Sequence, residues 1–355
     1  MREHFKLNEL RPTYLNPEKI IKTPGLFLNL PLLLTNVNST KTEGDRMSNN
    51  QSLEKLKILQ KFLFRLLHKT KLAYIFLIFV ISLTISGWSV ESAAVKIPIF
   101  GFHNIIDTQN TADLPPRRPA FDNDYSKQDF SVFLEYLFQN NYWFLSSQDL
   151  YEYFIEKSKP IPEQKMGKKP VMISFDDGYK GVYTNALPVL KKLSLLYKEN
   201  GKFVLFVNPH FLGVDMGRNF LPHTTCKDLR EGYQSGLYDV QSHGFTHKKL
   251  TELNGSDLEL EISKSKLALR KCLGDLDKNK VIGAYMAYPY GASDREVENI
   301  LPKYHLAGFL YNDKVLRVQR LTNNYRVSRI TTDKNMPPRE LIRIAKKASI
   351  LRKTK

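Results

Sequence analysis

The sequence predicts an α/β protein in which residues 95–333 form a closed or nearly closed barrel of mostly parallel strands. Strand-like and helix-like segments alternate along this part of the chain, and six or seven such units fit into its roughly 240 residues. No internal repeat or low-complexity tract interrupts the alternation. An uncharged apolar run precedes it, so we expect one N-terminal transmembrane or signal helix before the barrel.

The strand-like segments are short and apolar, rich in β-branched and aromatic residues, and bounded by turn or polar residues. They lie at residues 95–103, 171–175, 202–207, 238–243, 281–289, 306–311 and 325–330. The helix-like segments between them carry apolar residues at helical spacing, and one of them opens with the capping-box pair Ser256 and Glu259. They lie at residues 126–141, 146–157, 184–200, 225–235, 256–274 and 294–304.

The positive charge of the chain is concentrated at its two ends. The formal charge is +17, but residues 95–333 hold 32 Lys/Arg against 28 Asp/Glu, a balance of only +4. The excess lies in residues 1–94, with 13 against 7, and in residues 334–355, with 8 against 1. We therefore expect no nucleic-acid partner, because the body of the protein lacks a basic face with interleaved aromatic residues.

The uncharged run spans residues 72–90, "LAYIFLIFVISLTISGWSV", close to the length that crosses a bilayer. A buried core helix is the alternative, but the run has no polar face. Six basic residues precede the run and few charges follow it, so residues 1–71 are expected to be a cytoplasmic basic leader, partly disordered, with the rest exported. Small residues at 92–94 also suit signal peptidase, and Met47 could be the true start; retention and cleavage both stay open.

The two cysteines, Cys226 and Cys272, lie in the exported part. A disulfide and two free buried thiols are equally compatible with the sequence. The tail, residues 334–355, contains a basic amphipathic helix, for which capping the domain is favoured over a role at the membrane surface.

Two stretches at predicted strand ends carry candidate chemistry. "SFDDG" places Asp176 and Asp177 directly after a strand; alone, such a pair is usually a turn or a helix entry. "SHGFTH" places His243 and His247 four residues apart after another strand, and two imidazoles with one carboxylate make a three-ligand metal site with one open position. Either histidine alone would be read as a solvated loop residue, but the combination with "FDDG" favours a metal site.

A third stretch, "YPYG" at residues 288–291, ends another strand with a rigid aromatic turn. In this order the three stretches resemble the first three motifs of the polysaccharide deacetylases, the NodB-homology domain of carbohydrate esterase family 4. "IPIFGFHNI" and "NNYWFLSSQDLYEYF" resemble the lead-in of the branch that acts on poly-β-1,6-N-acetylglucosamine. The resemblance covers residues 95–333 and implies a distorted (β/α)7-type barrel.

The resemblance also implies roles for the motif residues. Asp177, His243 and His247 would hold a divalent metal, usually zinc, while Asp176 would be the catalytic base. Metal binding lowers the pKa of a bound water from about 15.7 to about 7, so a carboxylate suffices as its partner. The backbone N–H of Tyr290 would join the oxyanion hole, and Pro289 and Tyr290 would contact substrate.

Three departures from the family pattern bear on the site. Gly244 stands where a loop-bracing hydroxyl is common, and no arginine is evident in the third motif, so the base is expected to lack a cationic neighbour. No Leu-x-His is found near the C-terminus, so the general acid is unassigned. By position His103 is the best substitute, although it could merely brace the pocket; protonated Asp176 is the other candidate.

The expected function is hydrolysis of N-acetyl groups on an N-acetylglucosamine-containing polysaccharide, with release of acetate, by a membrane-anchored or secreted enzyme. A peptidoglycan or chitooligosaccharide deacetylase is an alternative of the same class. Two different classes stay open: a carbohydrate-binding or scaffold protein with an impaired site, and a membrane-surface interaction protein built on the basic ends.

Overall fold

The structure is a computed structural model that describes residues 57–58, 77–82, 94–215, 217 and 220–352. Contacts divide the chain into two units, Met1–Ile81 and Ser82–Lys355, of which the second contains the barrel. In the first unit only residues 57–58 and 77–81 are described, and they are helical. No helix within the described residues is long and apolar enough to cross a membrane. The helix expected over residues 72–90 lies mostly outside the described residues and stays a prediction.

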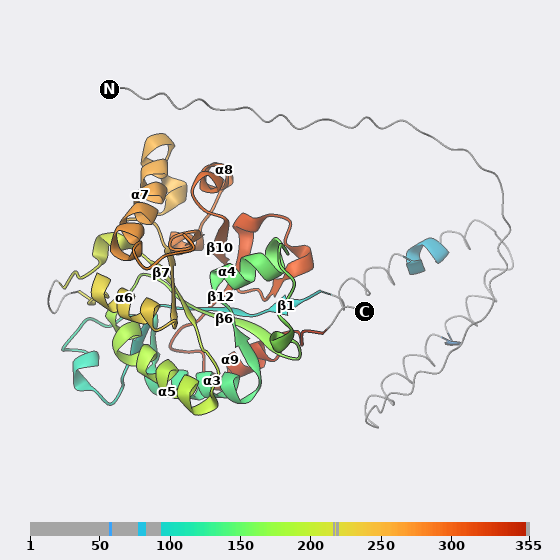
Figure 1. Ribbon diagram of the computed structural model, residues 1–355, viewed down its shortest axis with the longest axis horizontal. Coiled ribbons are helices and arrows are strands. Elements are labelled where there is room, and N and C mark those ends of the chain that lie inside the picture. The colour runs from blue at the N-terminus through green and yellow to red at the C-terminus, as the bar shows by residue number, and fades with distance from the viewer. Residues whose placement is uncertain (1–56, 59–76, 83–93, 216, 218–219, 353–355) are drawn as a thin grey trace. The chain divides into compact units, whose positions relative to one another are not determined.

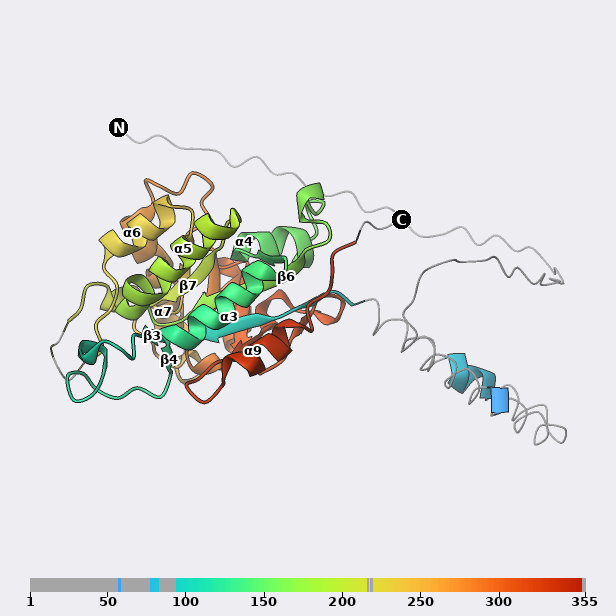
Figure 2. The same ribbon diagram turned by 90° about the horizontal axis from the view of Figure 1, so that it is seen from below.

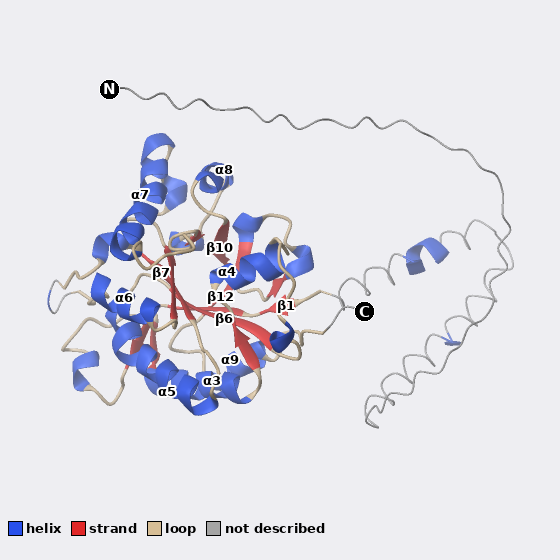
Figure 3. Ribbon diagram, in the orientation of Figure 1, coloured by secondary structure: helices blue, strands red, loops and turns tan. Residues whose placement is uncertain are grey.

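Seven parallel strands close into a barrel at the centre of the second unit (Figures 1 and 3). β6 pairs with β7 on one side and with β2 on the other, from Ile99↔Met172 to Phe102↔Phe175, which closes the ring. The predicted barrel is therefore confirmed. In their order around the barrel the strands are β2 (Ile99–Phe102), β12 (Val327–Thr331), β10 (Ala307–Tyr311), β9 (Tyr285–Ala287), β8 (Tyr238–Ser242), β7 (Phe203–Val207) and β6 (Lys169–Phe175).

Helices surround the barrel, and α3 lies between α5 and α9 in both views (Figures 1 and 2). The helix borders are α3 (Lys127–Gln139), α4 (Ser147–Leu150), α5 (Leu187–Tyr197), α6 (Cys226–Gln234), α7 (Gly255–Leu273), α8 (Arg295–Ile300) and α9 (Pro338–Ala345). Aromatic residues fill the layer between helices and sheet: Phe102 packs edge-on against Phe130 of α3 at 5.3 Å, and Phe175 lies 5.6 Å from Phe102. This apolar layer holds the strand ends in register.

Side-chain alternation along the strands sorts residues between this outer layer and the barrel interior. Met172, Val204 and Val327 belong to a second apolar cluster, which includes interior positions of the strands. Further along β6 the same alternation brings Ser174 and then Asp176 inward. The interior is thus apolar toward the amino ends of the strands and polar toward their carboxyl ends, which is where the candidate site lies.

Shorter elements were not predicted from the sequence, because two or three residues give too little periodicity. They are β5 (Tyr142–Phe144), which pairs with the start of β6, the pair β3 (Asn104–Ile106) with β4 (Asp124–Ser126), and β11 (Leu316–Arg317), whose partner β1 (Lys96–Ile97) lies inside the predicted segment 95–103. In the tail, Leu341 and Ile344 of α9 join the core cluster, so this helix packs on the domain. Cys226 and Cys272 form a disulfide between the start of α6 and the end of α7.

Candidate active site and metal centre

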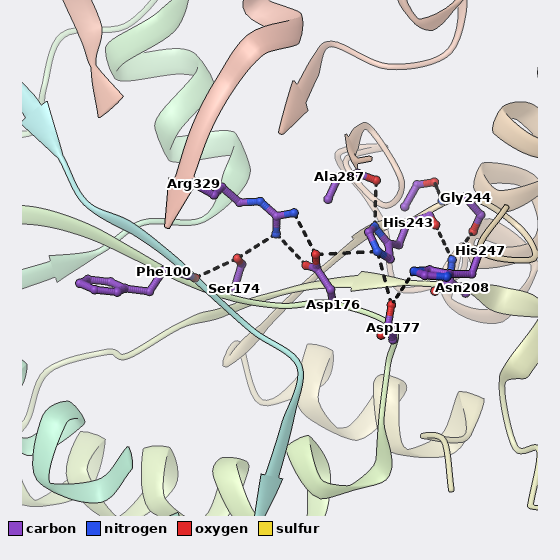
Figure 4. Close-up of polar contacts among 11 residues, drawn as sticks. Phe100, Ser174, Asp176, Asp177, Asn208, His243, Gly244, His247, Ala287 and Arg329 are labelled. Atoms are coloured by element: carbon purple, nitrogen blue, oxygen red, sulfur yellow. Dashed lines mark hydrogen bonds and ion pairs between the residues drawn. The ribbon is translucent and has the colours of Figure 1, made fainter. Parts of the chain in front are cut away.

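Asp176 follows the last residue of β6 and lies inside the barrel, fully shielded from solvent. Arg329 of β12 donates two hydrogen bonds to it, Nη1 to Oδ1 at 2.7 Å and Nη2 to Oδ2 at 2.8 Å (Figure 4). Nη1 also lies 3.3 Å from the hydroxyl of Ser174. Burial alone would raise the pKa of Asp176, but Arg329 and then His243 hold it below its usual value. The carboxylate is therefore ionised and fixed in one orientation.

Asp177 turns away from its neighbour because the chain bends sharply after β6. Its φ is +69° and that of Gly178 is +82°, both in the left-handed region. The N–H of Gly178 donates to the carbonyl of Asp176 at 2.9 Å, which closes the turn. A non-glycine residue in this conformation costs on the order of 1–3 kcal/mol and persists only where the surroundings impose it. The two adjacent carboxylates therefore point in different directions, that of Asp176 toward Arg329 and that of Asp177 toward His243 and His247.

His243 and His247 come from the loop after β8 and converge on Asp177. The Nε2 atom of His243 lies 3.4 Å from Oδ1 of Asp177, and that of His247 lies 3.2 Å from the same oxygen (Figure 4). His247 has a φ of +62°, so its backbone is also left-handed. One ligand atom from each of the three residues lies within 4.8 Å of the other two. The sequence prediction that these residues meet is consistent with this geometry.

The donor set of these three residues suits a cation. Nδ1 of His243 lies 2.9 Å from the carbonyl oxygen of Ala287 and donates to it, which leaves the lone pair of Nε2 facing Asp177. Oδ1 of Asp177 is buried and accepts no hydrogen bond among the described residues. The separations of 3.2 and 3.4 Å match the edge, about 3.3 Å, of a tetrahedron whose corners lie about 2.0 Å from a zinc ion. Three lone pairs that face one another need a positive charge between them.

The same charges favour protonation of His243 when no cation is present. Burial opposes a charge on this imidazole, but Asp176 and then Asp177 raise its pKa. A cation would compete with that proton for the same position. The residues therefore fit a divalent metal, and their donor types, two imidazoles and one carboxylate, are those of a catalytic zinc site.

A second set of residues braces the histidine loop. The side-chain amide of Asn208 donates to the carbonyl oxygens of His243 and of Gly244 (Figure 4). Glu261 of α7 accepts from the backbone N–H of Thr246 at 2.6 Å and from its hydroxyl at 2.9 Å. Gly244 has a φ of +76°, and a Cβ there would lie 3.2 Å from Oε1 of Glu261. A side chain at this position would be strained, and Asn208 and Glu261 supply the bracing expected from a hydroxyl.

The remaining predicted site residues lie around the three ligands. Tyr290 has a φ of +59°, its side chain is 67% exposed, and its ring lies 4.7 Å from that of His247. Pro289 before it is buried. The ring of His103 stacks on Tyr311 at 6.0 Å, and its Nδ1 is buried without a hydrogen-bond partner among the described residues. Burial lowers the pKa of His103 despite the nearby carboxylates of Asp177 and Asp176.

Arg329 is the site residue that the sequence analysis missed. The expectation that Asp176 lacks a cationic neighbour is wrong, because the arginine comes from β12 and not from the third motif. Its guanidinium also lies 4.0 Å from the ring centre of Tyr311 and 5.0 Å from that of Phe206. The available signal was "YRVSRI", in which an arginine stands at a buried position of a barrel strand, where a charge requires a partner.

Comparison with protein families agrees with this site. Residues 163–309 match the polysaccharide deacetylase family model. The chain carries a polysaccharide deacetylase domain. Among curated proteins, this domain is similar to a Staphylococcus aureus protein named poly-β-1,6-N-acetyl-D-glucosamine N-deacetylase, with 30% identity over 170 residues, 47% of this chain and 55% of that one. The chain thus spans about half the length of the curated relatives it matches.

Solved structures agree on the fold of the deacetylase domain. A polysaccharide deacetylase from Bacillus cereus matches 71% of this chain and 69% of its own with a TM-score of 0.56 and 21% identity. The structure of IcaB from Ammonifex degensii matches 71% of this chain and 97% of its own with a TM-score of 0.54 and 22% identity. At this level of identity the comparison establishes a shared fold.

Proposed function

We propose that this protein is a metal-dependent hydrolase that removes N-acetyl groups from an N-acetylglucosamine-containing polysaccharide. The observation that carries the proposal is the convergence of Asp177, His243 and His247 beside the buried carboxylate of Asp176. A divalent metal held by these three residues, which we take to be zinc, would acidify a water and stabilise negative charge on the substrate carbonyl.

The residues of the chain divide the reaction between them. Asp176, kept ionised by Arg329, takes the proton of the water as its oxygen bonds to the acetyl carbon. The backbone N–H of Tyr290 donates to the oxyanion. When the carbon–nitrogen bond breaks, the nitrogen takes up a proton, and acetate and a free amine leave. His103 is the proposed donor because it lies close enough to Asp176 for the two charges to interact, so it would pass the proton taken up by Asp176 to the nitrogen; direct return of the proton by protonated Asp176 is the alternative.

The proposed substrate is an exopolysaccharide of the poly-β-1,6-N-acetylglucosamine type, on the strength of the named relative and the lead-in segments. The test is acetate release by the purified full chain from β-1,6- and β-1,4-linked N-acetylglucosamine oligomers, with metal content measured on the same sample. Faster release from the β-1,6 oligomers supports the proposal. Preference for β-1,4 oligomers would favour a chitooligosaccharide or peptidoglycan enzyme, and tight metal without acetate would favour a carbohydrate-binding protein.

We also propose that the deacetylase domain lies outside the cytoplasm, held by a membrane segment at residues 72–90 or released by cleavage after it. The uncharged run with basic residues before it supports this. The disulfide between Cys226 and Cys272 does so too, because disulfides persist in oxidising compartments. Protease added to intact cells should degrade the domain, and N-terminal sequencing of the mature protein should locate any cleavage.

A further inference from the structure

A basic pocket of about 910 Å³ lies at the amino end of the barrel, away from the candidate active site. Lys96 stands just before β2 and Arg326 just before β12, so both mark the amino ends of parallel strands. Asp176 follows the carboxyl end of β6. Because the barrel strands are parallel, the two sites lie at opposite ends of the barrel.

The pocket is formed by three segments that are held together by backbone contacts. β1 pairs with β11, so that Lys96 stands opposite Arg317. The N–H of Ser349, in the chain after α9, donates to the carbonyl of Lys96 at 3.0 Å, and the N–H of Lys96 donates to the hydroxyl of Ser349 at 3.0 Å. These contacts fix the shape of the pocket.

The lining of the pocket is strongly cationic. Seven of its thirteen described lining residues are Lys or Arg, and none of the thirteen is Asp or Glu. One of the seven, Arg326, is paired with Glu298 at 2.7 Å, and Asp313 beside Lys314 accepts from the N–H of Thr331 at 2.9 Å. Lys314, Lys346 and Lys347 are exposed. Like charges gathered in one concave surface raise the local potential and favour a bound anion.

Apolar side chains accompany these charges. Val315 and Leu321 are half-buried in the lining. Ile350, next to Ser349, is 51% exposed, and Leu195 near the C-terminal end of α5 is 80% exposed. Helices that follow strands in a parallel barrel run back toward the amino end, so Leu195 belongs to the same end of the molecule. An end that combines exposed cations with exposed aliphatic side chains suits an interface between anionic headgroups and hydrocarbon.

The length of chain before the domain favours a membrane over a free anion. Five residues, 91–95, separate the end of the uncharged run from Lys96. At about 3.5 Å per extended residue, this stretch reaches only about 20 Å. A membrane segment at residues 72–90 would therefore keep Lys96 close to the bilayer surface.

We propose that this basic pocket binds the headgroup of an anionic phospholipid and so turns the amino end of the barrel toward the membrane, with the active site directed away from it. The inference rests on the membrane anchor in the proposed function and is independent of the hydrolytic chemistry. It assigns the basic end of the domain a role in orientation, so that a polysaccharide substrate meets the opposite end.

The test compares hydrogen exchange of the full chain in nanodiscs of phosphatidylcholine alone and of phosphatidylcholine with phosphatidylglycerol. We expect exchange of the backbone amides in residues 314–328 to slow several-fold with phosphatidylglycerol, and the effect to disappear in high salt. The variant Lys314→Gln/Lys346→Gln/Lys347→Gln should lose most of this protection. The matched variant Lys227→Gln/Lys264→Gln/Lys334→Gln removes three exposed lysines toward the carboxyl end of the barrel and should keep it, since Lys227 lies at the start of α6, Lys264 lies over the ring of Phe245 and Lys334 follows β12.

Equal exchange in the two lipids, or full protection in the pocket variant, would overturn the inference. Protection by inorganic phosphate or a soluble polyanion in pure phosphatidylcholine, as strong as that by phosphatidylglycerol, would overturn the membrane assignment in favour of a soluble anion. Failure of the chain to stay with the nanodiscs would overturn the anchor and this inference together. Acetate release from a soluble oligomer, measured on the same samples, separates these outcomes from failure of the hydrolase proposal.

Discussion

The two ends of the barrel differ in how they carry charge. At the carboxyl end, Asp176, Asp177 and His243 are buried, and each is held by a specific partner. At the amino end, Lys314, Lys346 and Lys347 line an open pocket and are exposed to solvent. The carboxyl end therefore holds its charged groups in fixed positions, whereas the exposed charges of the amino end can attract an anion over a longer distance.

Left-handed backbone conformations occur at both ends of the barrel, for example at Lys280 before β9 and at Asp313 next to Lys314. Asp177, His247 and Tyr290 all adopt left-handed φ values although none is glycine. Such conformations cost folding free energy and persist where packing imposes them. What distinguishes the carboxyl end is that three of these strained residues belong to the candidate site.

Loss of a metal ligand should produce the largest change. We expect His247→Gln to reduce acetate release by at least about three orders of magnitude, since a metal supplies several kcal/mol of transition-state stabilisation. Metal content and acetate release are the measurements. His210→Gln, which changes an exposed histidine, is the control and should behave as the native chain. Equal activity of the two variants would contradict a metal role for His247.

Removal of the buried arginine should have the next largest effect. Arg329→Met leaves Asp176 buried without its bidentate partner, so we expect a loss of about 3–5 kcal/mol in the free energy of unfolding. Arg326→Met at the amino end breaks an ion pair whose arginine is 59% exposed, and should cost no more than about 1 kcal/mol. Denaturant unfolding measures both. Similar losses in the two variants would contradict the difference between the two ends.

A pH effect should come from His305, which precedes β10 at the amino end. Burial, and then Lys266, lowers its pKa to about 3. The unfolded chain, with a histidine pKa of about 6.5, binds a proton between these values that the folded chain does not. As the pH falls from 6.5 toward 3, this group lowers the free energy of unfolding by up to about 1.4 kcal/mol per pH unit.

Denaturant unfolding as a function of pH tests this by comparing the native chain with His305→Gln. The stability of the variant should fall less steeply below pH 6.5, whereas His210→Gln should follow the native chain. If the free energy of unfolding of His305→Gln and of the native chain fell equally steeply below pH 6.5, the buried imidazole of His305 would not be the cause of the loss of stability in acid.

A pair of glycines should give the smallest effect and the finest comparison. Gly244, at φ +76°, would place a Cβ 3.2 Å from Glu261, whereas Gly236, at φ +74°, has nothing within 4 Å of such a Cβ. Substitution by alanine should cost each about 1–2 kcal/mol in stability from the left-handed backbone. Only Gly244→Ala should also weaken metal binding, measured by competition with a chelator. Equal metal affinity in the two variants would show that the histidine loop is not braced through Gly244.

The sequence was sufficient where the determinants are local. Alternating patterns predicted the parallel barrel, and the short motifs pointed to Asp177, His243 and His247, which the fold brings together, and to Asp176, which lies 3.8 Å from His243. Arg329 was missed because it and Asp176 are 153 positions apart in the sequence. Their side chains meet inside the barrel only after the strands have closed into a ring. The bracing by Asn208 and Glu261 is hidden for the same reason.

The disulfide illustrates a different limit. The positions of Cys226 and Cys272 are compatible with pairing or with two free thiols until α6 and α7 are packed side by side. Strand β5 escaped detection because three residues carry no readable period. These features depend on tertiary packing, which a single sequence does not display.

The most direct test of the account is the variant Asp176→Asn, measured for metal content and for acetate release from an N-acetylglucosamine oligomer. The account predicts that the variant keeps the metal content of the native chain, because Asp177, His243 and His247 are unchanged. It predicts a loss of acetate release of about 10²–10⁴-fold, the usual contribution of a general base. Native-like acetate release by a metal-loaded Asp176→Asn variant would contradict it.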